Sequence, residues 1–149
     1  MKEQDLLFMK KALDEAISAQ LHGDIPVGAV IVRNGEIIAS GHNNRELIND
    51  ATAHAEIVAI RNACQKLNSW HLDNCILYVT LEPCPMCMGA IVNSRIERVV
   101  FGAKDSKAGS CGSLLNLCAY PVNHKPLVTS GVLEEECGAL LSEFFKNKR

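Results

Sequence analysis

Two cysteines separated by two residues, Cys84 and Cys87, are the clearest chemical feature of the chain. On a helix, a separation of three residues corresponds to about 300° of rotation, so both sulfurs fall on one face. Pro85 suits the first position of a helix, and near a helix start the macrodipole favours a thiolate. Thiolates bind zinc, but a Cys-x-x-Cys pair also occurs in thioredoxin-like redox motifs. The pair alone therefore indicates either a metal site or a disulfide.

A second polar pair, His54 and Glu56, lies 30 residues upstream of Cys84. Two residues on a helix turn through about 200°, so these side chains cannot share a side face. Both can reach a point beyond the amino end of a helix, where His54 supplies a nitrogen ligand and Glu56 stands beside the metal. Taken alone, His54 is better explained as a core or capping histidine, and Glu56 as a first-turn acid. Together with the two cysteines, they predict one site.

Three protein ligands, His54, Cys84 and Cys87, leave zinc a fourth position for water, which is typical of catalytic rather than structural zinc sites. Zinc lowers the pKa of bound water to about 7. A neighbouring carboxylate such as Glu56 can take that proton and later deliver it to a leaving amine. The combination fits hydrolytic deamination of an amidine-like carbon.

The elements that position these residues alternate between helices and strands. Helical spacing of apolar residues predicts helices over 5–21, 52–67, 85–93 and 132–148. Apolar runs and an Asn-Gly turn predict strands over 27–32, 37–40, 75–80, 98–102 and 127–129, the last a weak edge strand. The segments 41–51 and 109–117 read as an irregular polar stretch and a glycine-rich loop before a short helix. The order predicts an α/β sandwich with a mixed sheet, antiparallel in the first hairpin and parallel later.

Length and composition fit one domain of ordinary soluble character, with 149 residues, 48% of them hydrophobic and 21% charged. No long apolar run follows the charged first residues, which predicts a cytoplasmic protein without a membrane span. Seven cysteines in such a protein argue against a disulfide framework. We expect five of them to be small buried hydrophobes, namely Cys64, Cys75, Cys111, Cys118 and Cys137.

The net charge of −2 argues against a general nucleic-acid coat protein. Basic residues nevertheless outnumber acidic ones between Arg95 and Lys107, and three of the last four residues, 146–149, are basic. On charge alone, a solvated face explains both stretches. The helix over 85–93 is apolar around more of its circumference than one buried face needs, through Met86, Met88, Ile91 and Val92. That excess fits either a subunit interface or a covered core helix.

His-x-Glu followed by Pro-Cys-x-x-Cys is the signature of the zinc-dependent cytidine deaminase superfamily. Within it, the chain resembles the bacterial tRNA-specific adenosine deaminases over nearly its whole length, through 25–30, 52–56, 78–84, 93–96, 99–105, 112–114 and the ending 144–149. The resemblance implies a three-layer α/β/α sandwich with a five-stranded mixed sheet, spanning residues 1–149 as a single deaminase domain. It also implies a homodimer with one Zn²⁺ per subunit that converts adenosine to inosine at wobble position 34 of tRNA-Arg(ACG).

The same resemblance implies a role for individual residues. His54, Cys84 and Cys87 become the zinc ligands, and Glu56 becomes the proton shuttle. Contacts with the anticodon stem-loop are assigned to Asn43, Val27, Ala53, Leu81, Asp105, Lys107, Phe145 and Arg149. Without the resemblance, Asn43 is equally a turn residue after Gly41, and Asp105 is a structural loop acid. Beside RNA, the Asp105 carboxylate is able to accept a hydrogen bond from a ribose hydroxyl.

Two alternatives stay open at this point. A small-molecule deaminase of the same fold would act on guanine, cytosine or a free nucleoside, and the segments 61–64 and 72–78 also resemble guanine deaminase. Against it, the region 95–113 and the basic ending resemble the tRNA enzymes. A non-catalytic, zinc-stabilised RNA-binding module would keep the three ligands but would have no use for Glu56.

Overall fold

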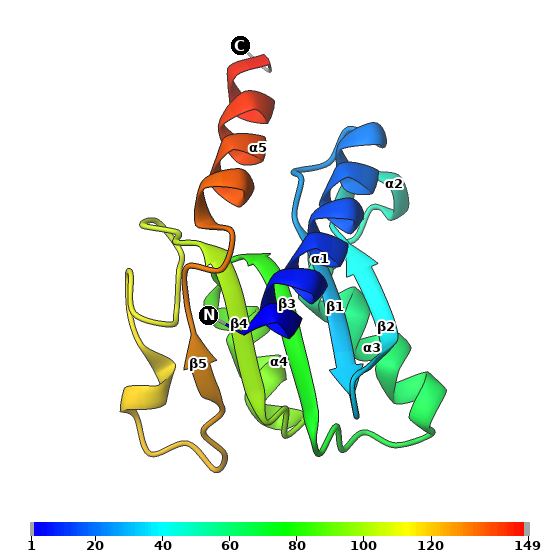
Figure 1. Ribbon diagram of the computed structural model, residues 1–149, viewed down its shortest axis with the longest axis vertical. Coiled ribbons are helices and arrows are strands. Elements are labelled where there is room, and N and C mark those ends of the chain that lie inside the picture. Colours follow the sequence, from blue (N-terminus) through cyan, green and yellow to red (C-terminus); the bar gives the residue numbers. More distant parts are fainter. Residues whose placement is uncertain (1, 148–149) are drawn as a thin grey trace.

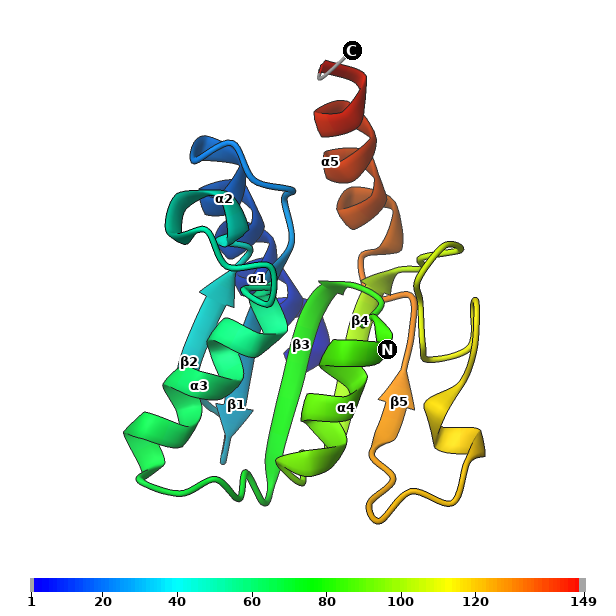
Figure 2. The same ribbon diagram turned by 180° about the vertical axis from the view of Figure 1, so that it is seen from behind.

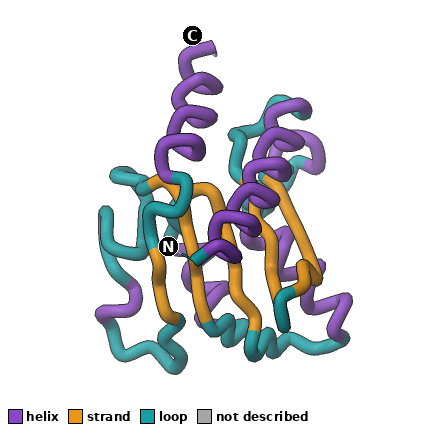
Figure 3. The backbone as a smooth tube through the Cα atoms, viewed as in Figure 1, coloured by secondary structure: helices purple, strands orange, loops and turns teal. Residues whose placement is uncertain are grey.

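The computed structural model describes residues 2–147, and its five strands form one sheet in the order β2-β1-β3-β4-β5 (Figure 3). Their bounds are β1 Gly28–Arg33, β2 Glu36–His42, β3 Cys75–Leu81, β4 Arg98–Ala103 and β5 Leu127–Thr129. Strand β1 pairs antiparallel with β2 and β3, whereas β3 with β4 and β4 with β5 are parallel. The mixed sheet predicted from the sequence is confirmed.

Helices cover both faces of the sheet, which gives the expected three-layer α/β/α sandwich. Helix α1 (Glu3–Leu21) lies on one face, and α5 (Glu134–Asn147) begins beside β4 on that face and extends beyond the end of the sheet (Figure 1). Helices α3 (Ala55–Leu67) and α4 (Pro85–Asn93) lie on the other face (Figure 2). Each face has its own apolar core because β1 and β3 are buried on both sides. No helix within residues 2–147 is long and apolar enough to cross a membrane.

Several element boundaries differ from the prediction. The helix expected over 52–67 begins at Ala55, because the Asp50 side chain accepts hydrogen bonds from the backbone and hydroxyl of Thr52 and holds it in a turn. The segment 41–51 contains a single-turn helix, α2 (Arg45–Ile48), where we expected irregular structure. The closing helix begins at Glu134 rather than 132, because Leu133 adopts a left-handed conformation with φ of 55°.

Two glycines allow helices to approach the sheet at backbone distance. A Cβ on Gly28 would lie 2.1 Å from the Ala12 carbonyl oxygen in α1. A Cβ on Gly41 would lie 2.6 Å from the Ala55 carbonyl oxygen, at the first turn of α3. Strand β2 therefore fixes the start of α3, the element that follows His54.

The expectation for the cysteines is only partly correct. Cys75 and Cys137 are buried, whereas the other three outside the Cys-x-x-Cys pair are partly exposed: Cys64, Cys111 and Cys118. None of the seven cysteines, all of which lie within residues 2–147, forms a disulfide. The partly exposed three lie on helix α3 and in the segment after β4, and all three pack against the core on the α3 and α4 side of the sheet.

A buried ion pair ties the amino end of the chain to three strands. Arg98 of β4 donates to both carboxylate oxygens of Asp5, at 3.0 and 2.7 Å, and also to the Thr129 hydroxyl in β5. The Tyr78 hydroxyl in β3 donates to Asp5 at 2.8 Å. The hydrogen bonds from Arg98 lower the pKa of Asp5 below its ordinary value, against the effect of burial. Arg98, part of the basic stretch noted in the sequence, thus serves the fold.

This network generates a stability prediction. Replacing Asp5 with Asn should cost about 3 kcal/mol of unfolding free energy, because Arg98 is left partly buried without its counter-ion. Since folding lowers the Asp5 pKa, the pair stabilises the protein above the unfolded value of about 3.9, and that contribution is lost as pH falls through the folded-state value. The measurement is urea unfolding of both proteins between pH 3 and pH 7.

The exposed Asp14→Asn change on the same helix is the control and should leave stability within about 0.5 kcal/mol. An Asp5→Asn protein as stable as the wild type at pH 7 would contradict this account of the network.

Candidate functional site

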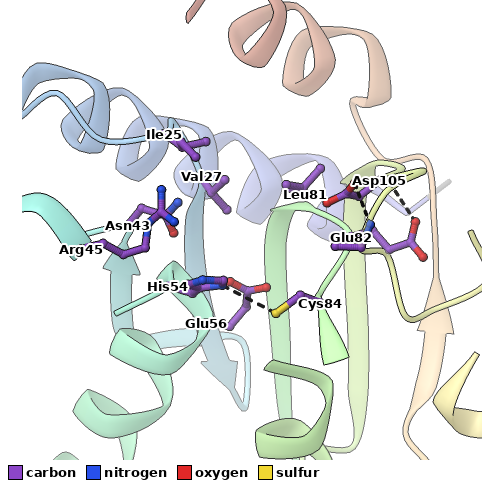
Figure 4. A pocket seen from close by; sticks show the side chains of 11 residues that line it. Ile25, Val27, Asn43, Arg45, His54, Glu56, Leu81, Glu82, Cys84 and Asp105 are labelled. Carbon is purple, nitrogen blue, oxygen red and sulfur yellow. Dashed lines mark hydrogen bonds between the residues drawn. The ribbon is translucent and has the colours of Figure 1, made fainter. Parts of the chain in front are cut away.

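The two segments that carry the predicted ligands meet near the carboxyl end of β3. His54 is the N-cap of α3 and Cys84 is the N-cap of α4, and both have extended backbones. Their carbonyls accept the first helical hydrogen bonds, from Val58 and Met88. Neither side chain caps its own helix, and the two side chains point toward one another (Figure 4).

The donor atoms have the spacing of a tetrahedral metal site. His54 Nδ1 lies 3.7 Å from Cys84 Sγ and 3.5 Å from Cys87 Sγ. Nitrogen and sulfur ligands of a tetrahedral zinc ion stand about 3.6 Å apart, given the usual Zn–N and Zn–S bond lengths. Within residues 2–147 these three form the one His, Cys, Asp or Glu group able to hold a metal ion. One imidazole and two sulfurs fit zinc.

Electrostatics at the two helix starts also suit a cation with thiolate ligands. Hydrogen bonds with Cys87 and His54 lower the pKa of Cys84 to about 4. The hydrogen bond with Cys84, together with burial, raises the pKa of Cys87. The contact with Cys84 raises the pKa of His54. A divalent cation bound at this group would hold both sulfurs as thiolates.

Glu56 lies inside the same site but outside the ligand group. Its side chain is buried in the first turn of α3, and burial raises the pKa of Glu56 to about 7. A carboxyl group that titrates near neutral pH can both accept and release a proton. The position therefore suits a proton carrier rather than a fourth ligand.

A cavity of about 290 Å³ opens over these groups, at the small end of the range for small-molecule sites. His54, Glu56 and Cys84 line its floor, and Val27 and Leu81 form apolar walls (Figure 4). The remaining lining residues are Ile25, Asn43, Arg45, Glu82, Asp105 and Ala108. A space of this size has room for one base and excludes a longer stretch of nucleic acid.

Asn43 joins the lining of this cavity to the start of α3. The side chain is buried, and Oδ1 accepts a hydrogen bond of 2.8 Å from the Ala55 backbone N–H. That bond satisfies one of the free N–H groups at the start of α3. The oxygen keeps a second lone pair beside the NH₂ group, so the Asn43 amide can offer both a donor and an acceptor to a bound group.

A second cavity of about 390 Å³ adjoins the first and shares Ile25, Leu81 and Asp105 with it. Its other lining residues are Lys104, Ser106, Lys107, Leu141 and Phe145. Two of the predicted contact residues, Lys107 and Phe145, therefore lie beside the first cavity rather than in it. One carboxylate oxygen of Asp105 accepts hydrogen bonds from the backbones of Lys107 and Ala108, so this acid also shapes its own loop.

Of the other two predicted contact residues, Ala53 lines neither of these cavities. Ala53 is fully buried, its N–H donates to the Asp50 carbonyl, and its carbonyl accepts from Asn44. Arg149 lies outside the described residues.

Sequence reasoning missed Ile25, Arg45, Glu82 and Ala108 as lining residues. Arg45 lies in the segment 41–51, which the sequence predicts to be irregular, so no pattern marks it as a site residue. Its Nε atom lies 3.6 Å from Oδ1 of the buried Asp24. For Glu82 the available signal was its position two residues before Cys84. Burial alone would raise the pKa of Glu82, but hydrogen bonds from Ser113, Asp105 and Cys111 hold it below its ordinary value.

Comparison with known proteins gives concordant results. Residues 2–103 match the family model described as the cytidine and deoxycytidylate deaminase zinc-binding region. The chain is 55% identical over 147 residues to a tRNA-specific adenosine deaminase of Bacillus subtilis, covering 98% of this chain and 91% of that protein.

Solved structures give the same picture. A structure from a study of A-to-I editing by tRNA:A34 deaminases at the wobble position has a TM-score of 0.88 and 45% identity, covering 90% of this chain and 98% of that one. Guanine deaminase from Bacillus subtilis is similar as well, with a TM-score of 0.66 and 38% identity. The match covers 99% of this chain and 94% of that one.

The geometry of the three donors predicts the effect of losing one of them. Cys84→Ser should lower zinc affinity by at least about a hundredfold, because even the outer partners of zinc ligands are worth about 10- to 100-fold. The measurement is metal content after dialysis against a competing chelator, followed by titration with zinc. Cys64, a partly buried cysteine on α3, provides the matched control, and Cys64→Ser should retain wild-type affinity. Equal zinc affinity in the two variants would contradict the ligand assignment.

Proposed function

The chain belongs to the tRNA-specific adenosine deaminases of the cytidine and deoxycytidylate deaminase family, and on that basis we propose that it converts adenosine 34 of tRNA-Arg(ACG) to inosine. The observation that carries the proposal is the pair of adjoining cavities, one with the metal-ligating group and Glu56, the other with a basic loop and Phe145. The names of the relatives support adenosine 34 of a tRNA as the substrate. The choice of tRNA-Arg(ACG) rests on the resemblance in sequence.

Substrate binding would divide between the two cavities. An anticodon base is already unpaired, so turning it into the first cavity costs less than flipping a base out of a duplex. The second cavity would take neighbouring nucleotides, with Lys104 and Lys107 near phosphates. Phe145, half-exposed on α5, offers a flat apolar surface for stacking a base.

The chemistry would be hydrolysis at C6 of adenine, in which water adds and ammonia leaves. When held by His54, Cys84 and Cys87, zinc supplies an activated water as the nucleophile. Glu56 would accept one proton from that water and pass it to N1 as the hydroxide adds to C6. It would then take the remaining proton of the added hydroxyl group and deliver it to the C6 amino group, which leaves as ammonia. The Asn43 NH₂ group donates to the base edge, and the walls formed by Val27 and Leu81 keep other water out.

The finer features of the enzyme are part of the same proposal. We infer one zinc ion per subunit, a homodimer, and a single catalytic domain over residues 1–149, in which the segment after residue 103 completes the second cavity. Three of the four apolar residues of α4 noted in the sequence are buried within the subunit, and Met86 remains exposed, so the dimer rests mainly on the resemblance. Seven cysteines without a disulfide and a tRNA substrate support a cytoplasmic location.

The deciding experiment offers the zinc-loaded protein a tRNA-Arg(ACG) anticodon stem-loop, with guanine, cytidine and free adenosine in parallel reactions. Inosine should form at position 34, because the second cavity binds nucleotides that the free compounds lack. Guanine is included because a guanine deaminase shares this fold. Turnover of the free compounds alone would replace the proposal with a small-molecule deaminase.

Glu56→Gln is the matched inactive variant for this assay. It should retain zinc and lower the turnover rate by about 10²- to 10⁴-fold, the usual contribution of a general acid–base group. A zinc-loaded Glu56→Gln protein with full activity would remove Glu56 from the mechanism. A wild-type protein that holds zinc, binds the stem-loop and deaminates none of the substrates would instead indicate a binding module.

A further inference from the structure

The side chain of Glu82 makes contacts that neither the metal site nor the proton transfer requires. Glu82 directly follows β3, two residues before Cys84, and its side chain is buried. Oε1 accepts hydrogen bonds from the Asp105 N–H at 3.1 Å and the Ser113 hydroxyl at 2.5 Å. Oε2 accepts from the N–H groups of Cys111 at 2.9 Å and Ser113 at 3.1 Å. One carboxylate therefore holds both ends of the loop 105–113.

The loop is packed directly onto this carboxylate. A Cβ on Gly109 would lie 2.4 Å from Glu82 Cδ, so there is no space between the middle of the loop and the side chain. The backbones join as well, because the Ser110 N–H donates to the Pro83 carbonyl at 2.8 Å. The segment from Glu82 to Cys84 thus carries the loop on one side and a ligand sulfur on the other.

This loop forms much of the wall that faces the substrate. Asp105 and Ala108 line the first cavity, and Asp105, Ser106 and Lys107 line the second. Because the connection from Glu82 to the ligand Cys84 is only two residues long, the carboxylate sets the distance between the loop and the metal ligands.

We propose that Glu82 is the positioning residue of loop 105–113 and that it sets the affinity of the enzyme for its RNA substrate without taking part in the chemistry at zinc. The inference rests on the proposed function for its substrate. The chemistry of the side chain is specific to an acid: a carboxylate has about four acceptor sites for four donors. An amide at the same place has one oxygen, and its NH₂ group would face N–H groups.

Charge and position predict opposite effects on RNA binding when this acid is replaced. Removing a negative charge beside a cavity that takes phosphates should, by charge alone, tighten binding. Releasing the loop should weaken binding, because Asp105 and Lys107 lose their fixed places. The sign of the change in affinity therefore separates positioning from simple electrostatics.

The experiment compares Glu82→Gln with the wild type on the anticodon stem-loop, with zinc content and amide hydrogen exchange measured on the same samples. KM should rise about tenfold or more, as expected for the loss of hydrogen bonds to a charged group. The turnover rate should fall by no more than about threefold, and zinc content should be unchanged. The amides of Asp105, Cys111 and Ser113 should exchange faster, which reports loop position without reference to activity.

Two further variants complete the design. Ser113→Ala removes one of the four donors, the hydroxyl group, at an exposed residue, so the variant should fold. Its KM should rise less than in Glu82→Gln, and its loop amides should also exchange faster than in the wild type. Glu36→Gln removes an equal charge from the exposed start of β2, outside both cavities. It should change neither KM nor the exchange rates of the loop amides.

Unchanged KM and unchanged loop exchange in Glu82→Gln would overturn the inference, and so would tighter RNA binding. If Glu82→Gln loses zinc while its loop amides exchange as slowly as in the wild type, Glu82 belongs to the metal site instead. If the wild type forms no inosine, the proposed function fails, whereas the exchange of the loop amides still decides whether Glu82 positions the loop.

Discussion

Three donor atoms within 4.8 Å of one another, from His54, Cys84 and Cys87, are the constraint on which the rest of the structure depends. The fold satisfies it by placing the starts of α3 and α4 near the carboxyl end of β3, with a ligand as the N-cap of each helix. The missing Cβ of Gly41 brings the first turn of α3 against β2. Both helix dipoles then favour negative charge on the sulfurs, so geometry and electrostatics act in the same direction.

The chain divides chemically at about residue 103, where the match to the family model ends. The part before it holds the metal ligands and Glu56, and the part after it supplies the loop 105–113 and helix α5 with Phe145. The hydrogen bonds of Glu82 join the two parts beside the metal ligands. In this account, the amino-terminal part determines the reaction, and the carboxyl-terminal part determines which adenosine reaches it.

Much of this architecture could be predicted from the sequence because local signals agree with the tertiary structure. Pro85 and the periodicity after it gave the bounds of α4, and apolar runs gave the buried strands. Contacts between distant segments could not be predicted. The pairing of Arg98 with Asp5 spans 93 residues, and the use of the Asn43 oxygen by Ala55 depends on how a loop meets a helix start. A local sequence pattern does not indicate which distant residue a side chain will contact.

The central claim is an open zinc site with one nitrogen and two sulfur ligands from the protein, and X-ray absorption at the zinc edge tests it most directly. The account predicts two sulfur scatterers at about 2.3 Å and two lighter scatterers at about 2.0–2.1 Å, one of them with the outer-shell pattern of an imidazole. The second lighter ligand should exchange with added small anions. Three or four sulfur scatterers, or a closed shell of protein ligands with no exchangeable position, would contradict the account.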